Sequence, residues 1–195
     1  MAWDAHILAG GLARRFGGRD KSALVVGARP ILDRQVAMLR GRAARIVIVG
    51  GRAGRAVPAG TTVVADRLPG TGALGALYTA LDDATSARTL VLACDMPFVT
   101  GEFVDYLART GLDCDVTLPR TEDGLHPFCA MYAREAAPVI RRSLDQGERR
   151  VREAVATLRL RVIEGRELAA FDPDGRLLHN INTQNDYDRA SAVRG

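Results

Sequence analysis

The chain has 195 residues, of which 47% are hydrophobic and 26% charged, and its formal net charge is +4 at pH 7. This composition is ordinary for a globular protein of one domain, and the mild positive charge selects no class of partner. Because it contains neither a run of about 20 apolar residues nor a signal-peptide pattern, we expect a cytoplasmic protein with no membrane partner. Cys94, Cys114 and Cys129 are widely spaced and form no C-x-x-C pair, so reduced, mostly buried thiols are predicted.

The first half of the chain alternates apolar runs with amphipathic segments. Continuous apolar runs predict buried strands at residues 6–9, 46–49, 62–65 and 89–93. Apolar residues at helical spacing predict one helix that begins at Pro30 and another that covers residues 74–81. In the second half, strands are predicted at 116–118, 128–132 and 161–163, and helices near 134–144, near 149–157 and from 184 to the end. The alternation predicts an α/β domain with a mainly parallel sheet.

Three features follow predicted strands and are therefore expected at the carboxyl edge of that sheet, where open α/β sheets bind ligands. They are the Gly10-Gly11 pair after the first strand, Asp66 after the third and Asp95 after the fourth. This agreement predicts a binding site there without reference to any family.

The first of these features opens a loop rich in glycine and cations that ends at Lys21. Paired glycines allow backbone N–H groups to converge on phosphate oxygens, and Arg14, Arg15 and Lys21 add positive charge. Lys21 is the only lysine among 27 basic residues, and a compact ammonium is not replaceable by arginine where it must reach a phosphate. The alternative is a surface lysine without a role. The loop matches neither a P-loop nor a dinucleotide-binding fingerprint, so it indicates triphosphate binding of another kind.

Asp95 follows the most apolar strand and precedes Met-Pro. A carboxylate there can hold Mg²⁺ beside phosphates, as nucleotidyl transfer requires, although a turn-forming aspartate is the alternative. For Asp66, a capping role in the following turn is an equally good explanation.

Other polar residues have both functional and structural explanations. Asn180, Asn182 and Asn185 are the only asparagines; they suit the edge of a heterocycle, but also Asx turns and an N-cap. His126 could bind a phosphate or, more commonly for a lone histidine, satisfy a backbone group. The basic run at residues 147–152 is either a solvated face or a site for an anion.

The run L-A-G-G-L-A-R-R-F-G-G-R-D-K, from Leu8 to Lys21, resembles the signature of the molybdenum cofactor guanylyltransferases of the glycosyltransferase-A-like nucleotidyltransferase superfamily. Further motifs occur in the family's order: C-D-M-P at 94–97, H-P at 126–127, G-E-R-R-V at 147–151 and N-I-N-T at 180–183. The resemblance implies a single-domain, Rossmann-like three-layer sandwich over 1–195 with a mostly parallel central sheet, of the nucleotide-diphospho-sugar transferase type. It further implies a nucleotide-binding half at about 1–100 and an acceptor-binding half at about 101–195.

The implied activity is transfer of GMP from GTP to the phosphate of molybdenum-molybdopterin, with Mg²⁺ as cofactor and pyrophosphate as leaving group. By the same resemblance, Lys21 and Arg15 act on the phosphates, and Asp95 holds the metal. The resemblance also assigns nucleotide contacts to Leu8, Ala9, Gly10, Gly11 and Asp66, and pterin contacts to Asn180 and Asn182. Proteins that deliver or receive the cofactor are possible partners; nucleic acid is not an expected one.

The chain departs from the family at Val49-Gly50-Gly51, where some members carry an asparagine that contacts the nucleotide. L-A-G-G, rather than the L-A-A-G typical of cytidylyltransferase relatives, still favours GTP by resemblance. The alternatives are a related enzyme that uses CTP or a sugar phosphate, and a non-catalytic nucleotide-binding relative. An oxidoreductase is a more distant alternative.

Overall fold

The computed structural model describes residues 2–9, 24–26, 29–50, 57–181, 183 and 186–188. Its strands are β1 Asp4–Leu8, β2 Val25–Val26, β3 Arg29–Pro30, β4 Arg45–Val49, β5 Thr62–Val64, β6 Arg88–Ala93, β7 Val116–Thr121, β8 Gly124–Leu125, β9 Cys129–Ala133 and β10 Leu160–Ile163. Its helices are α1 Ile31–Leu39, α2 Gly72–Asp83, α3 Gly101–Arg109, α4 Ala137–Asp145, α5 Val151–Ala156 and α6 Gly165–Ala169, with a 3₁₀ turn at Arg134–Ala136. In these residues, no helix has the length and apolar character that a membrane crossing requires.

The main sheet has the strand order β10-β7-β9-β6-β1-β4-β5, and β8 pairs with β7. Strands β1, β4, β5 and β6 are mutually parallel along this path, and β10 is parallel to β7. Strand β9 is antiparallel to both of its neighbours, β6 and β7. The predicted α/β class and largely parallel sheet are confirmed, and the reversal at β9 makes the sheet mixed.

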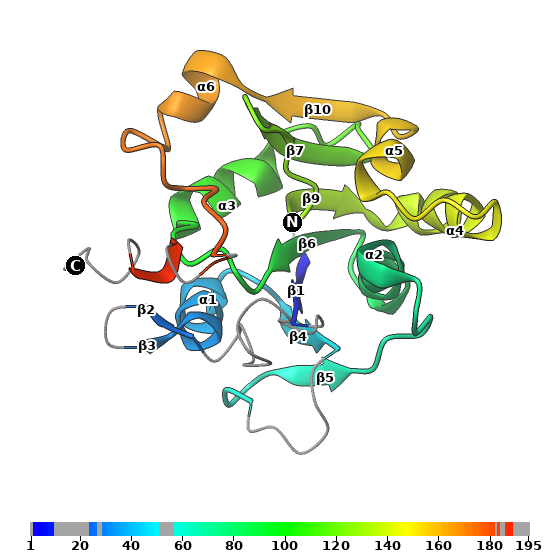
Figure 1. Cartoon of the computed structure of the whole chain (residues 1–195), viewed down its shortest axis with the longest axis horizontal. Helices are drawn as coiled ribbons and strands as arrows, with labels where there is room; N and C mark the ends of the chain where they lie inside the picture. Colours follow the sequence, from blue (N-terminus) through cyan, green and yellow to red (C-terminus); the bar gives the residue numbers. More distant parts are fainter. Residues whose placement is uncertain are drawn as a thin grey trace.

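Helices cover both faces of the sheet, which gives the three layers seen in Figure 1. One core joins the sheet to α1, α3 and α6, with Leu32, Phe103 and Leu168 among its residues. The other joins the opposite face to α2, α4 and α5, with Leu77 and Ile140 among its residues. Successive strand residues alternate between the two cores, as a sheet buried on both sides requires.

The predicted strands and the helices at α1, α2, α4 and α5 are present, with shifts of one to three residues at most ends. Helices α3 and α6, the β2–β3 hairpin and β8 were not expected. Helix α3 has a recognisable start, because the Thr100 side chain accepts a hydrogen bond from the Phe103 amide at 3.3 Å. Of the helix predicted from residue 184 onward, only 186–188 are described, and these are helical.

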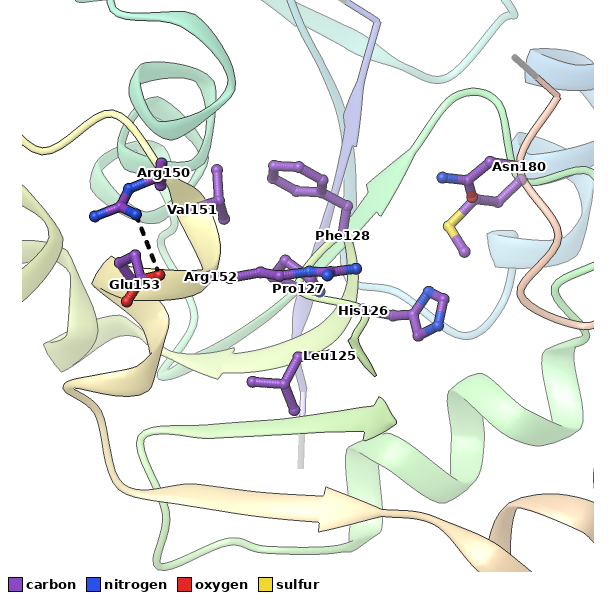
Figure 2. A pocket seen from close by; sticks show the side chains of 10 residues that line it. Leu125, His126, Pro127, Phe128, Arg150, Val151, Arg152, Glu153 and Asn180 are labelled. Atoms are coloured by element: carbon purple, nitrogen blue, oxygen red, sulfur yellow. Dashed lines mark ion pairs between the residues drawn. The ribbon is translucent and has the colours of Figure 1, made fainter. Parts of the chain in front are cut away.

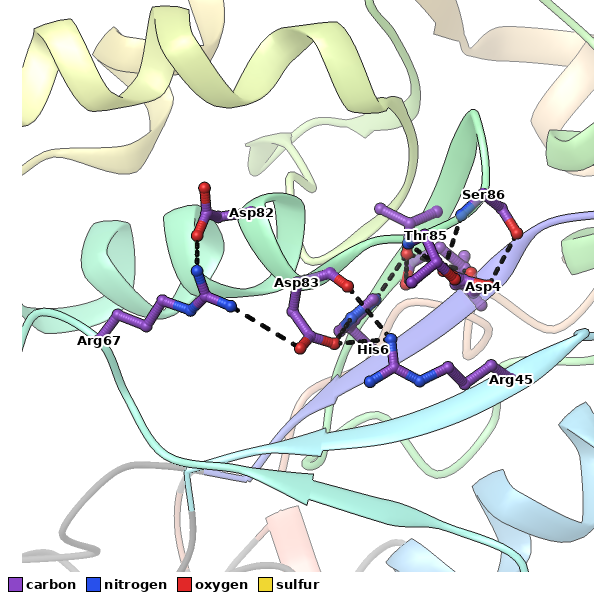
Figure 3. A network of polar contacts seen from close by, with 10 residues as sticks. Asp4, His6, Arg45, Arg67, Asp82, Asp83, Thr85 and Ser86 are labelled. Atoms are coloured by element: carbon purple, nitrogen blue, oxygen red, sulfur yellow. Dashed lines mark hydrogen bonds and ion pairs between the residues drawn. The ribbon is translucent and has the colours of Figure 1, made fainter.

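A polar network ties together the amino ends of β1 and β6 (Figure 3). The Asp4 carboxylate accepts hydrogen bonds from both the amide and the hydroxyl of Thr85 and of Ser86, at 2.7–3.0 Å. Burial raises the pKa of Asp4, but these hydrogen bonds together outweigh it and hold the pKa below its usual value. The network fixes the end of the sheet opposite to the predicted site.

Candidate functional site

The carboxyl ends of four parallel strands lie level at one edge of the sheet. Leu8, the last residue of β1, is paired with Val49 on one side and with Ala93 on the other, and Val49 is paired with Val64. Three backbone hydrogen bonds continue this alignment past the strands: Ala9 N to Val49 O at 3.0 Å, Cys94 N to Leu8 O at 3.2 Å and Gly50 N to Val64 O at 2.8 Å. The strands that precede the predicted site residues therefore end together at one edge of the sheet.

Asp95 lies in the turn that directly follows β6. Its backbone carbonyl accepts a hydrogen bond from the amide of Ile181 at 2.9 Å, and the next side chain, Met96, is only 2% exposed. The turn is thus held by a segment more than 80 residues later in the chain, which brings the asparagine motif to the same edge as Asp95.

Asp66 lies at the far end of this edge, just after β5. Its Oδ1 accepts a hydrogen bond from the Leu68 amide at 3.0 Å and lies 3.1 Å from the hydroxyl of Thr79 in α2. The structure therefore shows the capping role that the sequence left open. Since β5 is three strands from β6, about 14 Å at the usual strand spacing, Asp66 and Asp95 are not placed to share one ion.

Several predicted residues lie outside the described residues: Gly10, Gly11, Arg14, Arg15 and Lys21 in the first loop, Gly51 after β4, and Asn182 and Asn185 near the C-terminus. Leu8 and Ala9, which lead into that loop, are 7% and 8% exposed. Gly50 has a φ of +75°, a backbone conformation that favours glycine, and its N–H is already used by Val64 O. That N–H therefore does not replace the missing asparagine.

A cavity of about 410 Å³ lies beside the Asp95 turn (Figure 2). Six of its ten lining residues belong to four of the motifs quoted above, and the full lining comprises Met96, Leu125, His126, Pro127, Phe128, Arg150, Val151, Arg152, Glu153 and Asn180. The reversed strand β9 explains this proximity, because its first residue, Cys129, pairs with Leu92 near the end of β6. The loop before β9 therefore reaches the carboxyl edge of the parallel strands, and Ala93 N donates to Phe128 O at 2.8 Å.

The cationic groups of the cavity come from the start of α5. Arg150 is an exposed arginine that forms ion pairs with Glu148 at 3.5 Å and Glu153 at 3.6 Å. The guanidinium of Arg152 lies over Gly124, where a Cβ would come within 3.1 Å of it. The basic run thus contributes two cations to the cavity, the solvated Arg150 and Arg152 beside Gly124.

His126 contributes an imidazole that is mainly uncharged at neutral pH. Burial lowers its pKa, and the nearby Arg152 guanidinium lowers the pKa further. Its Nε2 lies 2.7 Å from the hydroxyl of Thr121. The sequence left two partners open for His126, a phosphate and a backbone group; the hydrogen bond shown here is instead to a side-chain hydroxyl, and the ring lines the cavity. The phosphate contact stays a prediction.

Asn180 brings an amide to the cavity, and its Oδ1 is buried without a hydrogen-bond partner in the part of the chain that the structure describes. Farther along, Thr183 and Asp186 exchange hydrogen bonds: the Thr183 amide donates to the Asp186 carboxylate at 2.8 Å, and the Asp186 amide to the Thr183 hydroxyl at 3.1 Å. This reciprocal pair assigns the capping role there to Thr183 and not to Asn180.

The described residues contain no group of three or more His, Cys, Asp or Glu side chains that could hold a metal ion. Such a group is not needed for Mg²⁺, which is usually held by one or two carboxylates together with substrate phosphates and water. The single carboxylate of Asp95 at the carboxyl edge of the sheet fits that donor set. The three cysteines are thiols and not disulfides, and burial raises the pKa of Cys129 to about 12, so this thiol is a packing group.

Sequence reasoning missed the apolar wall of this cavity, formed by Leu125 and Phe128, and the way in which Arg152 faces it. The available signal was the His-Pro pair at the start of a strand, which marks a loop but not the direction of the strand.

A largely parallel sheet with a glycine-rich sequence after its first strand and a carboxylate after its fourth is typical of nucleotide-binding α/β proteins, and here a cavity adjoins the turn that carries this carboxylate. Comparison with known proteins identifies the class more closely. Residues 5–161 match the family described as "MobA-like NTP transferase domain", and the chain belongs to this family of nucleotidyltransferases.

The relatives match over nearly the full length. The molybdenum cofactor guanylyltransferase of Desulfosudis oleivorans is 31% identical, over 96% of this chain and 93% of that protein. The crystal structure of molybdopterin-guanine dinucleotide biosynthesis protein A from Archaeoglobus fulgidus superposes with a TM-score of 0.80 at 25% identity, covering 97% of each chain. The 2-C-methyl-D-erythritol 4-phosphate cytidylyltransferase of Thermus thermophilus, at 15% identity and a TM-score of 0.71 over 96% of each chain, shares the fold.

Proposed function

We propose that the chain is a molybdenum cofactor guanylyltransferase, which transfers GMP from GTP to the phosphate of molybdenum-molybdopterin and forms the guanine dinucleotide. The observation that carries this proposal is the convergence of the level strand ends and the motif-lined cavity on one turn, Cys94–Met96. Nearly full-length relatives that bear the name of this activity support the choice of substrates.

The reaction needs no covalent intermediate and no general base. An ionised phosphate oxygen of the pterin attacks the α-phosphorus of GTP, the new P–O bond forms, and the bond to the β-phosphate breaks to release pyrophosphate. Catalysis then depends on positioning and on neutralising charge. Asp95 would hold Mg²⁺, which when bound neutralises phosphate charge and helps to orient the α-phosphate.

Within a single domain, residues of about 1–100 bind the nucleotide. Leu8, Ala9, Gly10 and Gly11 contact the nucleotide, and Lys21 and Arg15 supply positive charge to its phosphates. Asp66, whose carboxylate is already engaged by Leu68 and Thr79, belongs to the far end of the same edge and contacts the nucleotide beyond the phosphates.

Residues of about 101–195 bind the acceptor, in the cavity of Figure 2. The apolar walls of Leu125, Phe128 and Val151 suit a flat heterocycle, and the guanidinium groups of Arg150 and Arg152 suit its phosphate. Asn180, with a buried amide oxygen that accepts no bond from the described residues, and its neighbour Asn182 supply polar contacts to the pterin.

The test is an incubation of the protein with Mg²⁺, molybdenum-molybdopterin and, separately, GTP, CTP, ATP or UTP, with the dinucleotide and pyrophosphate quantified. GTP should be the productive nucleotide. Product with CTP alone would replace guanylyl by cytidylyl transfer, and nucleotide binding without pyrophosphate release would identify a non-catalytic relative.

Asp95→Ala should lower the rate of transfer by at least about 100-fold, because the metal loses its carboxylate. The matched control is Asp113→Ala, at an exposed aspartate after α3, which should leave the rate unchanged. EDTA should abolish wild-type turnover. An Asp95→Ala protein with near wild-type turnover would remove this residue from the reaction.

A further inference from the structure

Helix α1 carries one buried polar side chain on its apolar face. Gln35 is 3% exposed and shares this face with Leu32, Val36 and Leu39, all of which belong to or border the core. A buried amide is unfavourable unless its groups are hydrogen-bonded, so the contacts of Gln35 require an explanation.

The amide nitrogen of Gln35 donates to two backbone carbonyls that lie on either side of Asp95. Nε2 is 2.8 Å from the oxygen of Ala93 and 3.1 Å from that of Met96. Both protons of the amide group are therefore directed to the ends of a single turn, and this turn presents Asp95.

The amide oxygen of Gln35 indicates that the side chain acts through the two hydrogen bonds that its nitrogen donates. Its Oε1 is buried and accepts no hydrogen bond from the residues that the structure describes. The opposite orientation of the amide would place this oxygen against two carbonyl oxygens. An apolar side chain of similar size would pack on the same face without a buried, unsatisfied acceptor, so packing alone does not account for a glutamine.

The backbone of the turn is also hydrogen-bonded to other segments, by the Cys94 amide to Leu8 O and by the Asp95 carbonyl to the Ile181 amide. Gln35 adds side-chain hydrogen bonds to the carbonyls of Ala93 and Met96. It does so from helix α1, which follows the glycine-rich loop in the chain. Met96 also lines the acceptor cavity, so these hydrogen bonds lie where the two substrates are expected to meet.

We propose that Gln35 is a positioning residue that sets the Asp95 turn for binding of the metal–nucleotide complex. The inference rests on the proposed function for the role of Asp95. It predicts that loss of the two donors weakens metal-dependent nucleotide binding more than it weakens the fold, because residues behind a metal ligand commonly affect metal affinity or activity by about 10- to 100-fold.

The test compares Gln35→Met, which keeps the volume and removes both donors, with the wild type. Thermal unfolding is measured with GTP and Mg²⁺ and with GTP and EDTA, and the difference between the two midpoints reports metal-dependent binding without any turnover. Gln35→Met should lose most of this difference, and the Mg²⁺ concentration for half-maximal activity should rise by about 10-fold or more. Gln35→Glu, which is similar in size but has an acceptor in place of the donors, should show the same losses as Gln35→Met. It replaces Gln35→Met in the test if the methionine variant fails to fold.

The matched control is Thr89→Val, at a fully buried polar residue near the opposite end of β6. It breaks the bond between Thr89 and His6, so it should lower the midpoint without ligand and keep the metal-dependent difference. If the Gln35 variants keep this difference and their Mg²⁺ dependence, the inference is overturned. Because the difference is measured without the pterin, a wild type that binds GTP with Mg²⁺ but makes no dinucleotide refutes the proposed function and leaves the Gln35 comparison decisive.

Discussion

His6 is a fully buried histidine in the middle of β1 with both ring nitrogens engaged. Nδ1 lies 2.7 Å from the Thr89 hydroxyl, and Nε2 lies 3.1 Å from Asp83, which also pairs with Arg45 at 2.9 Å (Figure 3). Burial lowers the pKa of His6, although the carboxylates of Asp83 and Asp4 act in the opposite direction. The folded protein therefore takes up a proton on His6 only below the pH at which the unfolded chain does.

This lowered pKa predicts a loss of stability on mild acidification. As the pH falls from 7 through 6.5 toward the lower pKa of the folded state, the unfolded chain binds more protons and the free energy of unfolding decreases. His6→Gln should cost about 1–3 kcal/mol of stability at pH 7, because it disturbs a buried network, and should flatten the decrease between pH 7 and pH 5. Urea unfolding at several pH values measures both effects.

The control is His179→Gln, at an exposed histidine, which should keep the wild-type slope. The pKa of His126 is also lowered, so part of the decrease in the free energy of unfolding with falling pH should remain in the His6→Gln variant. An unchanged slope in His6→Gln would show that His6 does not control this pH dependence.

Single residues differ in how far the sequence reveals them. Asp95 could be placed at the sheet edge because a strongly apolar strand ends just before it. Gln35 had a signal that went unused: it occupies the i+3 position between Leu32 and Val36, where an apolar residue is expected. The pattern marks it as buried and polar, but the turn that it contacts lies almost 60 residues away and depends on tertiary structure.

At the scale of elements, the first turn of helix α2 packs against the loop that follows Asp66. Gly75 packs there against Thr71, whose hydroxyl donates to Leu68 O at 2.6 Å. The Gly75 carbonyl in turn lies 2.9 Å from the hydroxyl of Thr79, which also contacts Asp66. This glycine allows the close approach that keeps the turn against the helix.

Gly75→Ala should therefore destabilise the protein, although alanine is favoured over glycine in most helices. The new Cβ would overlap the Thr71 hydroxyl and come within 3.1 Å of Leu68 O, and overpacking of this kind costs about 1–3 kcal/mol. Chemical unfolding measures the change. In a Thr71→Ala background the same substitution should cost less than half as much, because the hydroxyl is absent; an equal cost in both backgrounds would contradict the steric explanation.

Elements with continuous apolar runs were predictable from the sequence, whereas α3 was not, because its apolar pattern is too short. Its buried residues Phe103, Val104 and Leu107 form a short stripe in nine residues, so the sequence signal depends mostly on the Thr100 cap. Strands of two residues, such as β2, β3 and β8, are defined by their pairing with a neighbouring strand and are too short to show a periodic pattern in the sequence.

At the scale of the whole molecule, the position of the proposed acceptor cavity depends on the direction of β9, which is reversed relative to both of its neighbours. A mainly parallel sheet was predictable from its buried strands, but the direction of β9 was not, because an apolar run has the same appearance in both directions. In a fully parallel sheet, the loop before β9 would lie at the amino edge. The reversal brings His126 and Phe128 to the carboxyl edge, so the cavity that they line adjoins the end of β6.

The proposed division into a nucleotide-binding and an acceptor-binding half predicts that binding of the two substrates can be altered separately. Arg152→Gln removes a cation from the acceptor cavity on the β9 side, away from the ends of β1, β4 and β5. The KM for molybdenum-molybdopterin should therefore rise by about 10-fold or more, since charge-assisted contacts with phosphate contribute about 1.5–3 kcal/mol. Stabilisation of the protein by GTP with Mg²⁺ should remain at the wild-type level. The control is Arg109→Gln, at an exposed arginine at the end of α3, which should change neither quantity. If Arg152→Gln instead weakened GTP binding as much as acceptor binding, the two regions would act as one site, and the assignment of the cavity to the acceptor would be wrong.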